Sequence, residues 1–398
     1  MVLLSINAGS SSLKVAVFND AHAETPSESI SIEGIGSAKA AIIPNGEFGN
    51  KDTTYLAIKD FDEAAEQAKK WLSEKKNIQA KDIRAIGHRV VHGGARYVEA
   101  APVNEDLLSY LKATTPLAPN HMPATITSIE AFLDAYQDAP QIACFDTSFF
   151  HNVPKVAKYF ALPLSLQRRY KIRRYCFHGL VYQSVLEDFQ KHEGAMAAKG
   201  RVIMAHLGNG VSVCACRNGK PIDMSMGFTP VSGTMMSTRI GDVEPGLITY
   251  LQQGAGFSIN EVSHLMSHQA GLLGVSGTTA DMYTLLHTQD DNPNVAFALD
   301  LFTYKLRKTI GEMAAALNGV DSIIFSGGIG ERSSEIRQKI CSELGYLNVT
   351  LNNERNARSE RLISADTSAV GVHVIQARED YSIITQMLDV LNREGKNE

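Results

Sequence analysis

Residues 2–18, VLLSINAGSSSLKVAVF, contain two apolar segments separated by a short polar one. Val, Leu and Ile dominate 2–6 and 13–18, which predicts two β-strands, and the Gly and Ser residues of 7–12 favour the tight turn of a hairpin. The same pattern, RVIMAHL-GNG-VSVCACR, returns half a chain later at 201–217, and the segment PIDMS that follows predicts a third short strand. Two polar-tipped hairpins at this spacing indicate a duplicated domain.

The segments between and after the hairpins predict helices that alternate with strands. Helices are expected at 61–76, 123–136 and 382–393, and the longest at 295–318, where apolar residues recur with a period close to that of a helix. SIIFSGGIGERSSEIR at 322–337 predicts a strand, a glycine turn and a helix. This alternation predicts an α/β fold.

Composition and charge restrict the class of protein. The chain has 398 residues, of which 44% are apolar, so disordered and fibrous proteins are excluded. Its 38 basic and 43 acidic residues give a net charge of −5, so we expect no nucleic-acid partner. No apolar run approaches the ~18 residues that span a bilayer, and the start has no basic leader, so we expect no membrane segment. Five cysteines, an odd number, favour a reducing cytoplasm over a disulfide scaffold.

Three glycine or serine turns offer backbone amides to a phosphate group. They lie at 7–12, 208–210 and 327–330, and none matches the pattern GxxxxGK[ST]. Each turn alone is equally typical of an ordinary connection. Three together, two of them in duplicated positions, favour phosphate binding.

Charged residues inside apolar segments form a second group of candidates, because a buried charge needs a partner. Arg89 lies in GHRVVHGG, Asp146 follows the apolar IACF, and Arg239 lies in a loop rich in Gly, Ser and Thr. Each has a plainer alternative: a surface arginine on a strand, a helix or turn cap, and a local ion pair with Asp242 or Glu244.

The histidines and the closest cysteine pair permit simpler interpretations. His88 and His92 have the spacing of a helical zinc site, but the Val-Val pair between them favours a strand, which excludes that geometry. His178 in RRYCFHGL, taken alone, is typical of a core histidine, and Cys214 and Cys216 are expected to pack in the core.

Eight motifs together carry a family resemblance. In order and spacing they resemble the acetate kinases and related short-chain acyl kinases, from Asn7 to about Glu379. The motifs are NAGSSSLK (7–14), HRVVHGG (88–94), FDTSF (145–149), RRYCFHG (173–179), AHLGNGVS (205–212), SMGFTP (225–230), MMSTRIGD (235–242) and SGGIGE (326–331).

The resemblance implies a fold, a domain division and an assembly. The fold is a pair of duplicated RNase-H-like domains of the actin, sugar-kinase and heat-shock ATPase superfamily, flanking an interdomain cleft. Residues 1–148 with 384–398 are expected to form the N-terminal domain, and 149–383 the C-terminal, nucleotide-binding domain. A homodimer is also implied.

The implied activity is the reversible transfer of the γ-phosphoryl group of ATP to acetate, which gives acetyl phosphate and ADP. The carboxylate attacks in line, and because it is ionised at neutral pH no general base is needed. A propionate or butyrate kinase is the alternative within this class. A nucleotide-dependent clamp or sensor of the same fold is the alternative from another class.

The resemblance also assigns residues by matching motifs. The catalytic residues are Arg89, Asp146, His178 and Arg239. The carboxylate is held by Arg89, Val91, Asn120, Phe177 and Pro230. ATP and its phosphates are bound by Asn7, Ser10, Ser12, Lys14, His206, Asn209, Gly210, Asp281, Gly328, Ile329 and Gly330. Mg²⁺, or Mn²⁺, is bound by Asn7, Asp146 and Glu379.

The sequence departs from the family pattern at several positions. Near the catalytic motifs, Phe150 replaces a histidine and Val181-Tyr182 replaces a Ser-His pair. On the nucleotide side, Tyr283 replaces an arginine and Arg332 an asparagine, which leaves the nucleotide preference open. Asn120 replaces a leucine in the carboxylate pocket, from which we expect weaker acetate binding or a substrate with a polar tail.

Overall fold

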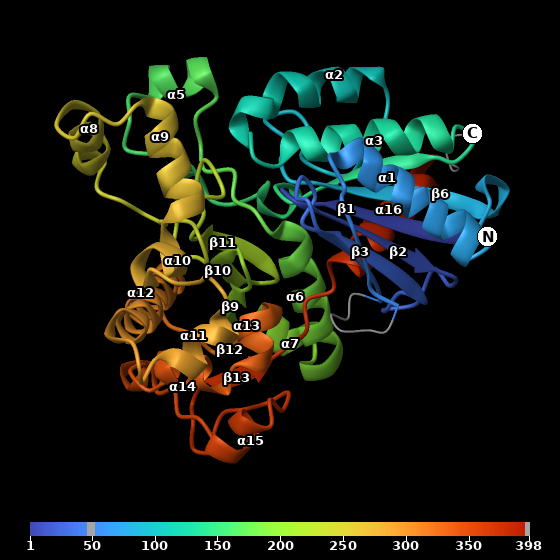
Figure 1. The fold of residues 1–398 in the computed structure, drawn as a ribbon. Coiled ribbons are helices and arrows are strands. Elements are labelled where there is room, and N and C mark those ends of the chain that lie inside the picture. The colour runs from blue at the N-terminus through green and yellow to red at the C-terminus, as the bar shows by residue number, and fades with distance from the viewer. Residues whose placement is uncertain (46–51, 395–398) are drawn as a thin grey trace. The chain divides into compact units, whose positions relative to one another are not determined.

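The computed structural model describes residues 1–45 and 52–394. Its residues form two compact units. Unit 1 comprises Met1–His151, Phe177–Ser184 and Arg378–Glu398, and unit 2 comprises Asn152–Cys176 and Val185–Ala377. Residues 395–398, the end of the segment predicted to return to the first domain, lie outside the described residues. Each unit contains one sheet (Figure 1).

The sheet of unit 1 begins with the predicted hairpin. β1 and β2 pair antiparallel, with Ile6 opposite Val15, while β6 and then β8 continue the sheet parallel to β1. The strand order is β5-β4-β3-β2-β1-β6-β8-β7. The strands are β1 (Val2–Ala8), β2 (Ser12–Phe18), β3 (Glu28–Glu33), β4 (Ala40–Pro44), β5 (Thr54–Leu56), β6 (Ile83–Val90), β7 (Ala101–Pro102) and β8 (Gln141–Phe145).

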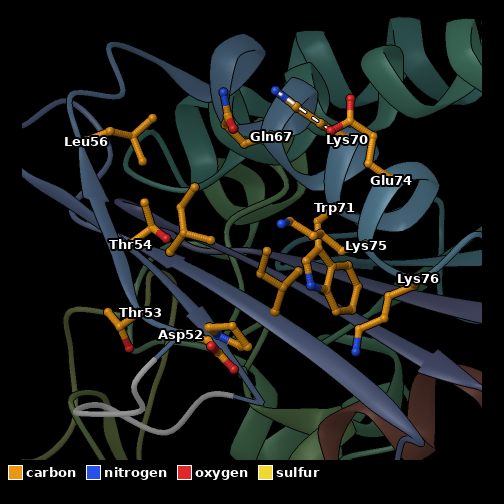
Figure 2. Close-up of a pocket in the computed structure, with 13 residues that line it drawn as sticks. Asp52, Thr53, Thr54, Leu56, Gln67, Lys70, Trp71, Glu74, Lys75 and Lys76 are labelled. Carbon is orange, nitrogen blue, oxygen red and sulfur yellow. Dashed lines mark ion pairs between the residues drawn. The ribbon is translucent and has the colours of Figure 1, made fainter.

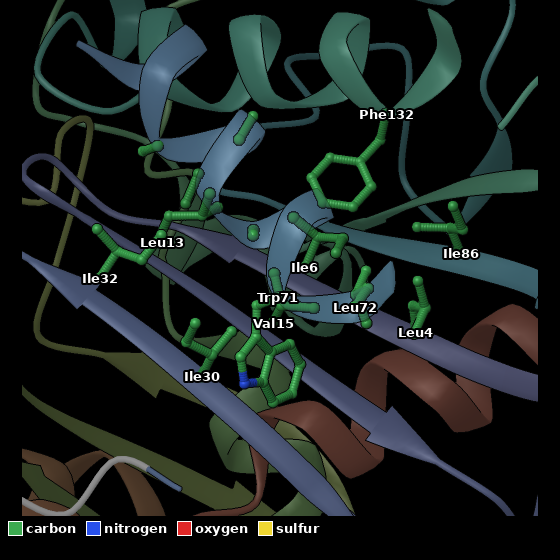
Figure 3. Packing of buried hydrophobic residues seen from close by; sticks show 14 of the residues in the cluster. Leu4, Ile6, Leu13, Val15, Ile30, Ile32, Trp71, Leu72, Ile86 and Phe132 are labelled. Atoms are coloured by element: carbon green, nitrogen blue, oxygen red, sulfur yellow. The ribbon is translucent and has the colours of Figure 1, made fainter. Parts of the chain in front are cut away.

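Two apolar clusters form the core of unit 1, one on each face of the sheet. Leu4 and Ile6 of β1 pack with Phe132 and Trp71 (Figure 3). Because side chains alternate along a strand, Leu3 packs in the other cluster, with Ile383 and Met387. The helices are α1 (Phe61–Lys70), α2 (Glu105–Thr114) and α3 (Met122–Ala135), with α16 (Glu379–Glu394) in the second cluster.

Unit 2 repeats the five-strand arrangement β3-β2-β1-β6-β8 of unit 1. Its sheet runs β11-β10-β9-β12-β13, in which β9 and β10 form the second predicted hairpin and β12 lies parallel to β9. The strands are β9 (Arg201–Leu207), β10 (Val211–Arg217), β11 (Lys220–Met224), β12 (Ser322–Ser326) and β13 (Gly371–Val374). In both sheets a three-stranded antiparallel meander is followed by two strands parallel to its first strand, so the duplication is confirmed.

The helices of unit 2 include the long core helix that the sequence predicts. α12 (Pro293–Leu317) buries the periodic apolar residues and ends at Asn318, which adopts a left-handed conformation. The other helices are α4 (Lys155–Lys158), α5 (Leu164–Tyr170), α6 (Gly179–Glu193), which begins in unit 1, α7 (Ala195–Lys199), α8 (Pro245–Gln253), α9 (Ile259–His264), α10 (Gly271–Ser276), α11 (Met282–Thr288), α13 (Gly327–Arg332), α14 (Ser334–Cys341) and α15 (Asn353–Ala357).

Short non-α turns complete the chain. Single 3₁₀ turns lie at Ala80–Asp82, Thr115–Leu117, Ser148–Phe150 and Gly345–Leu347, and π-helical turns at Trp71–Lys75 and Leu265–Gln269. Within residues 1–45 and 52–394, no helix is long and apolar enough to cross a bilayer.

Candidate active site

Three predicted site residues lie at the carboxyl ends of the parallel strands of unit 1. Asn7 is near the end of β1, Arg89 near the end of β6, and Asp146 directly after β8. The amide of Asp146 donates to the carbonyl of Val90 at 3.0 Å, which extends the pairing of β6 and β8 by one residue. In open α/β sheets, ligands bind at this edge.

Arg89 joins these residues to Glu379, the first residue of α16. Its Nη2 lies 2.7 Å from Asp146 Oδ2, and its Nε lies 3.3 Å from Oδ1. Nη1 donates to Glu379 Oε2 at 3.2 Å and to Asn7 Oδ1 at 3.3 Å, while Asn7 Nδ2 donates to the same Glu379 oxygen at 2.8 Å. The structure thus brings together four residues that the sequence predicted from separate motifs. The surface alternative for Arg89 is wrong, because most of its side chain is buried among these partners.

The charges of this cluster offset one another. Burial opposes the charged form of Arg89, but the Asp146 and Glu379 carboxylates outweigh burial and raise the pKa of the guanidinium. Burial also raises the pKa of Asp146, and the nearby Arg89 opposes that rise. The guanidinium therefore stays protonated at physiological pH, and its charge favours the ionised form of the buried carboxylate against the effect of burial on the Asp146 pKa.

His178 reaches the cluster through its backbone. Its φ of 61° lies in the left-handed region, and its amide donates to the Asp146 carboxylate. The next amide, of Gly179, donates to the Asp146 carbonyl at 3.0 Å. A Cβ at Gly179 would lie 2.1 Å from that carbonyl oxygen, so only glycine fits where α6 begins.

Asp380 is a carboxylate of this region that sequence reasoning missed. It accepts a 2.7 Å hydrogen bond from Ser5 Oγ of β1, and burial raises its pKa. Both Ser5 and Asp380 lie beside predicted residues, Asn7 and Glu379. An acidic pair that opens a helix was the available signal, but its contact with β1 is visible only in three dimensions.

The other predicted residues of unit 1 lie on loops and strand ends. The tip of the β1–β2 hairpin exposes Ser10 and Lys14 and half-buries Ser12, and the amide of Gly9 donates to the Ser12 carbonyl at 2.8 Å. Val91 follows β6 and is buried. Phe177 is buried with its ring edge-on to His92 at 5.6 Å, whereas Asn120 is exposed in the turn before α3.

In unit 2 the second hairpin lies beside the glycine-rich segment that follows β12, which forms the short helix α13 instead of the predicted turn. His206 of β9 contacts Ser326, with Nδ1 and Oγ 3.3 Å apart. Gly327, with a φ of 78°, lies so close that a Cβ there would be 2.8 Å from the Leu207 carbonyl oxygen. Two of the three predicted phosphate turns are therefore neighbours. The tip residues Asn209 and Gly210 are exposed and half-buried, and in α13 Gly328 is exposed, Ile329 half-buried and Gly330 buried.

The loop of Arg239 is attached to that same hairpin. The amide of Ser237 donates to the Asn209 carbonyl at 3.4 Å, and Arg239 Nη1 donates to the Pro230 carbonyl at 3.0 Å. The predicted arginine and the predicted pocket proline are thus in contact. Asp242 and Glu244, the acids of the alternative ion pair, accept hydrogen bonds from backbone amides of Gly233 and of the first turn of α8.

Two residues around the predicted adenosine segment show different local roles. Asp281 caps α11 by accepting from the Thr284 amide and hydroxyl, which lowers the pKa of its carboxyl. Arg337, which sequence reasoning missed, is fully buried and donates to the carbonyls of Gly330 and Glu331. Burial lowers its pKa to about 10. This arginine holds the C-terminal end of α13.

The Asn7, Asp146 and Glu379 side chains present the hard oxygen atoms that Mg²⁺ prefers, so the predicted metal residues fit the ion chemically. Among the described residues, no three His, Cys, Asp or Glu side chains are placed to hold a metal by themselves. Mg²⁺ in phosphoryl-transfer sites commonly uses one or two carboxylates and completes its shell with phosphate and water.

Figure 2 shows a cavity of about 690 Å³ elsewhere in unit 1, between strands β3–β5 and the helical segment of Trp71. Ile30, Ile42 and the indole of Trp71 contribute apolar surface, and the Lys70–Glu74 ion pair lies on the helical side. None of its 13 lining residues is a predicted site residue. The cavity therefore supplies nothing to the chemistry of the Arg89 cluster.

The duplicated sheet order, with polar turns at the carboxyl ends of the central strands, places the chain in the class of duplicated RNase-H-like proteins. Comparison with known proteins agrees. The model of the acetokinase family matches residues 2–385. The acetate kinase of Rhodopseudomonas palustris is 39% identical over 389 residues, covering 96% of each chain.

Solved structures give the same result. The acetate kinase of Porphyromonas gingivalis superimposes with a TM-score of 0.87 and 30% identity, covering 98% of this chain and 99% of that one. A propionate kinase from Francisella tularensis gives 0.89 and 32%, covering 97% and 98%. The chain belongs to the acetokinase family, whose members are ATP-dependent phosphotransferases that act on a carboxylate.

Proposed function

We propose that this protein transfers the γ-phosphoryl group of ATP to acetate, reversibly, to give acetyl phosphate and ADP. The Arg89 cluster is the observation that carries the proposal. Asp146, Glu379 and Asn7 hold the Arg89 guanidinium in one orientation beside the carboxyl ends of three parallel strands, and an arginine fixed in this way offers directional donors to a carboxylate or phosphoryl oxygen.

Catalysis in this proposal consists of alignment and charge neutralisation. The acetate carboxylate is already ionised, so no residue needs to remove a proton before it attacks the γ-phosphorus. Arg89 and Arg239 orient the carboxylate and the phosphoryl group in line, and His178 donates to the oxygens on which charge develops. Val91, Phe177, Pro230 and Asn120 surround the rest of the acceptor.

For nucleotide and metal binding we propose the residues that the family resemblance assigns. We assign the phosphates to Asn7, Ser10, Ser12 and Lys14 of one hairpin and to His206, Asn209 and Gly210 of the other, and the adenosine to Asp281 and Gly328–Gly330. Asp146 and Glu379, with Asn7, would hold Mg²⁺ or Mn²⁺. A bound divalent ion would offset the charge of the phosphate oxygens.

The test of the mechanism is a hydroxamate assay with ATP, Mg²⁺ and acetate, run on the wild type, Arg89→Ala, Arg239→Ala and the double variant. We expect each single variant to lower kcat at least 100-fold. If both arginines act on one transition state, the double variant loses much less than the product of the two effects. Single variants that keep the full rate contradict the proposal.

Asn120 is the residue that suggests an alternative acceptor. Propionate or butyrate, or a carboxylate with a polar tail, remains the second candidate because an unpaired amide beside a methyl group costs about 1–3 kcal/mol. Asn120 is exposed, which allows water to satisfy its amide. We expect acetate to have the highest kcat/KM in a panel with propionate and glycolate, and a preference for glycolate that Asn120→Leu abolishes would favour the alternative.

We further propose a cytoplasmic homodimer. All five cysteines are free and buried, which supports a reducing compartment. Large apolar side chains are exposed in two stretches of unit 2, 156–170 and 247–259, which supports a contact with a second copy. We call these two stretches the apolar face.

A further inference from the structure

Three aromatic rings of unit 1 contact one another next to the Arg89 cluster. Phe150 is edge-on to Phe149, with centroids 5.2 Å apart, and edge-on to Tyr182 at 6.1 Å, while Phe149 and Tyr182 stack at 6.4 Å. Phe150 and Tyr182 are 2% and 0% exposed, and Phe149 is half-buried. We call this group the aromatic triad.

The triad joins the two chain segments that carry Asp146 and His178. Phe149 and Phe150 belong to the 3₁₀ turn that starts two residues after Asp146. Tyr182 lies in the first turn of α6, where its amide donates to the His178 carbonyl at 3.0 Å. The two segments are therefore joined in two ways: by the ring contacts of the aromatic triad, and by the hydrogen bonds that link Asp146 to the backbone of His178 and Gly179.

The two segments approach each other so closely around those hydrogen bonds that no further side-chain atom fits between them. A Cβ at Gly179 would lie 2.1 Å from the Asp146 carbonyl oxygen and 2.7 Å from Cβ of Phe149. His178 holds a φ of 61°, a conformation that a non-glycine residue keeps only where its surroundings enforce it. Removing a ring of the triad leaves space into which the first turn of α6 can relax.

Positions 150 and 182 are also two of the positions at which this chain departs from the family pattern. The pattern has a histidine at each, whereas this chain has Phe150 and Tyr182, and these two side chains contact each other. The two departures therefore meet in one aromatic contact. Edge-to-face packing of this kind is directional, so it constrains both backbones.

We propose that the aromatic triad is a positioning element that fixes the Asp146 carboxylate, and the backbone of His178 that donates to it, in the orientation that Arg89 engages. This inference rests on the proposed function for its catalytic consequence, because Asp146 is assigned there to the reaction. The structural part of the inference is that the first turn of α6 does not move relative to Asp146, and this part does not depend on the activity.

The experiment compares Tyr182→Leu, Tyr182→Phe and Phe150→Leu with a matched control, Phe132→Leu. Phe132 is an equally buried aromatic of unit 1 that packs in the cluster of Leu4 and Ile6. Two readouts are taken: amide hydrogen exchange of Gly179 by NMR or mass spectrometry, and steady-state kinetics in the hydroxamate assay with acetate and Mg²⁺ varied.

We expect Tyr182→Leu and Phe150→Leu to speed the exchange of the Gly179 amide at least 10-fold, to lower kcat at least 10-fold and to raise the Mg²⁺ concentration needed for half-maximal rate. The KM for acetate stays within twofold of wild type. Tyr182→Phe keeps the ring and changes both readouts less than Tyr182→Leu does, and Phe132→Leu changes neither the Gly179 exchange nor kcat by more than twofold.

Two failures can be told apart. A wild type without acetate-dependent hydroxamate formation overturns the proposed function, while the exchange readout still decides the positioning inference. An active wild type whose Tyr182→Leu variant keeps kcat and slow Gly179 exchange overturns the inference alone. Equal effects of Tyr182→Leu and Phe132→Leu on both readouts also overturn it, because the loss then reflects general destabilisation.

Discussion

The Arg89–Asp146 ion pair, to which we assign a role in the reaction, is also expected to contribute to stability. Arg89→Ala leaves the Asp146 carboxylate buried without its partner, which we expect to lower the free energy of unfolding by about 3–5 kcal/mol at pH 8. Burial already raises the Asp146 pKa, and the variant raises it further. A group whose pKa is higher in the folded than in the unfolded state contributes stability that is lost as pH rises through the folded-state pKa. The stability that Arg89→Ala loses relative to wild type is therefore expected to be smaller at low pH.

Urea unfolding at pH 8 and pH 5.5 measures this dependence. The control is Arg84→Ala, an exposed arginine on the same strand, which we expect to change the free energy of unfolding by less than about 0.5 kcal/mol at either pH. If Arg89→Ala is less stable than wild type by the same free energy at both pH values, Asp146 does not carry the unpaired charge.

His88 gives a second prediction at the scale of one residue. Burial lowers its pKa from 6.5 to about 4, although Gln141 Oε1 lies 2.7 Å from Nε2. A histidine with a lowered pKa stabilises the fold above pH 6.5, and this stability is lost as pH falls toward 4. Between pH 6.5 and 5 the loss approaches about 2 kcal/mol, at 1.36 kcal/mol per pKa unit.

His88→Gln removes the titrating ring while keeping a donor for Gln141. We expect the variant to lose about 2 kcal/mol less than wild type between pH 6.5 and 5 in chemical unfolding. His287→Gln, a change at an exposed histidine, serves as the control and leaves the pH dependence of wild type unaltered. Parallel pH profiles of His88→Gln and wild type would contradict the assignment.

At the scale of elements, α16 depends on a glycine in β6. A Cβ at Gly87 would lie 2.5 Å from Cγ2 of Ile383, so α16 packs against the sheet only because residue 87 has no side chain. Gly87→Ala is expected to lower the free energy of unfolding by about 1–3 kcal/mol through overpacking. Because Glu379 opens α16, the same change is expected to lower kcat.

The partner substitution tests that contact directly. Ile383→Ala removes the clashing methyl group, so the double variant is expected to be more stable than the sum of the two single losses, by about 1 kcal/mol in thermal or urea unfolding. Purely additive losses would show that Gly87 and Ile383 do not interact.

The elements that sequence predicted well are those whose pattern is local. The two hairpins, the core helix of 295–318, and the strand and the second helix of 322–337 follow from alternation and helical period and are confirmed, whereas the predicted glycine turn forms the short helix α13. The strands β3–β5 were not predicted, although each pairs with the strand before it in the chain, and residues 71–75 of the helix predicted at 61–76 form a π-helical turn. Asp380 and Arg337 were missed because each is defined by partners on other segments.

At the scale of the whole molecule, duplication explains why the residues proposed for phosphate binding occur in two similar hairpins. Both sheets contain the same five-strand arrangement, and in each the first strand ends in a polar-tipped hairpin, with Asn7 in one unit and His206 in the other close to that tip. Under the proposed function, one fold built twice supplies two phosphate-binding turns without a long Walker loop. The cluster around Arg89 differs, because Arg89, Asp146 and Glu379 all lie outside the duplicated hairpins.

The homodimer is the prediction that belongs to the whole molecule. The apolar face exposes side chains that a monomer would leave in water, including Val156 at 93% and Ile259 at 72% exposure. Burying one such side chain contributes about 1.5–3 kcal/mol, so a contact that covers several of them can hold two copies together at micromolar concentration. We expect sedimentation at twice the 43.3 kDa of one chain.

The double variant Val156→Asp with Ile259→Asp places two charges on the apolar face and is expected to sediment as a monomer with unchanged circular dichroism, since neither side chain packs in a core. Met196→Asp, which changes an equally exposed side chain outside the apolar face, is the control and stays dimeric. If the double variant remains a dimer, the contact lies on another face. If the wild type is a monomer at 10 µM, roughly the upper range of the affinity argued above, the protein does not form the proposed homodimer.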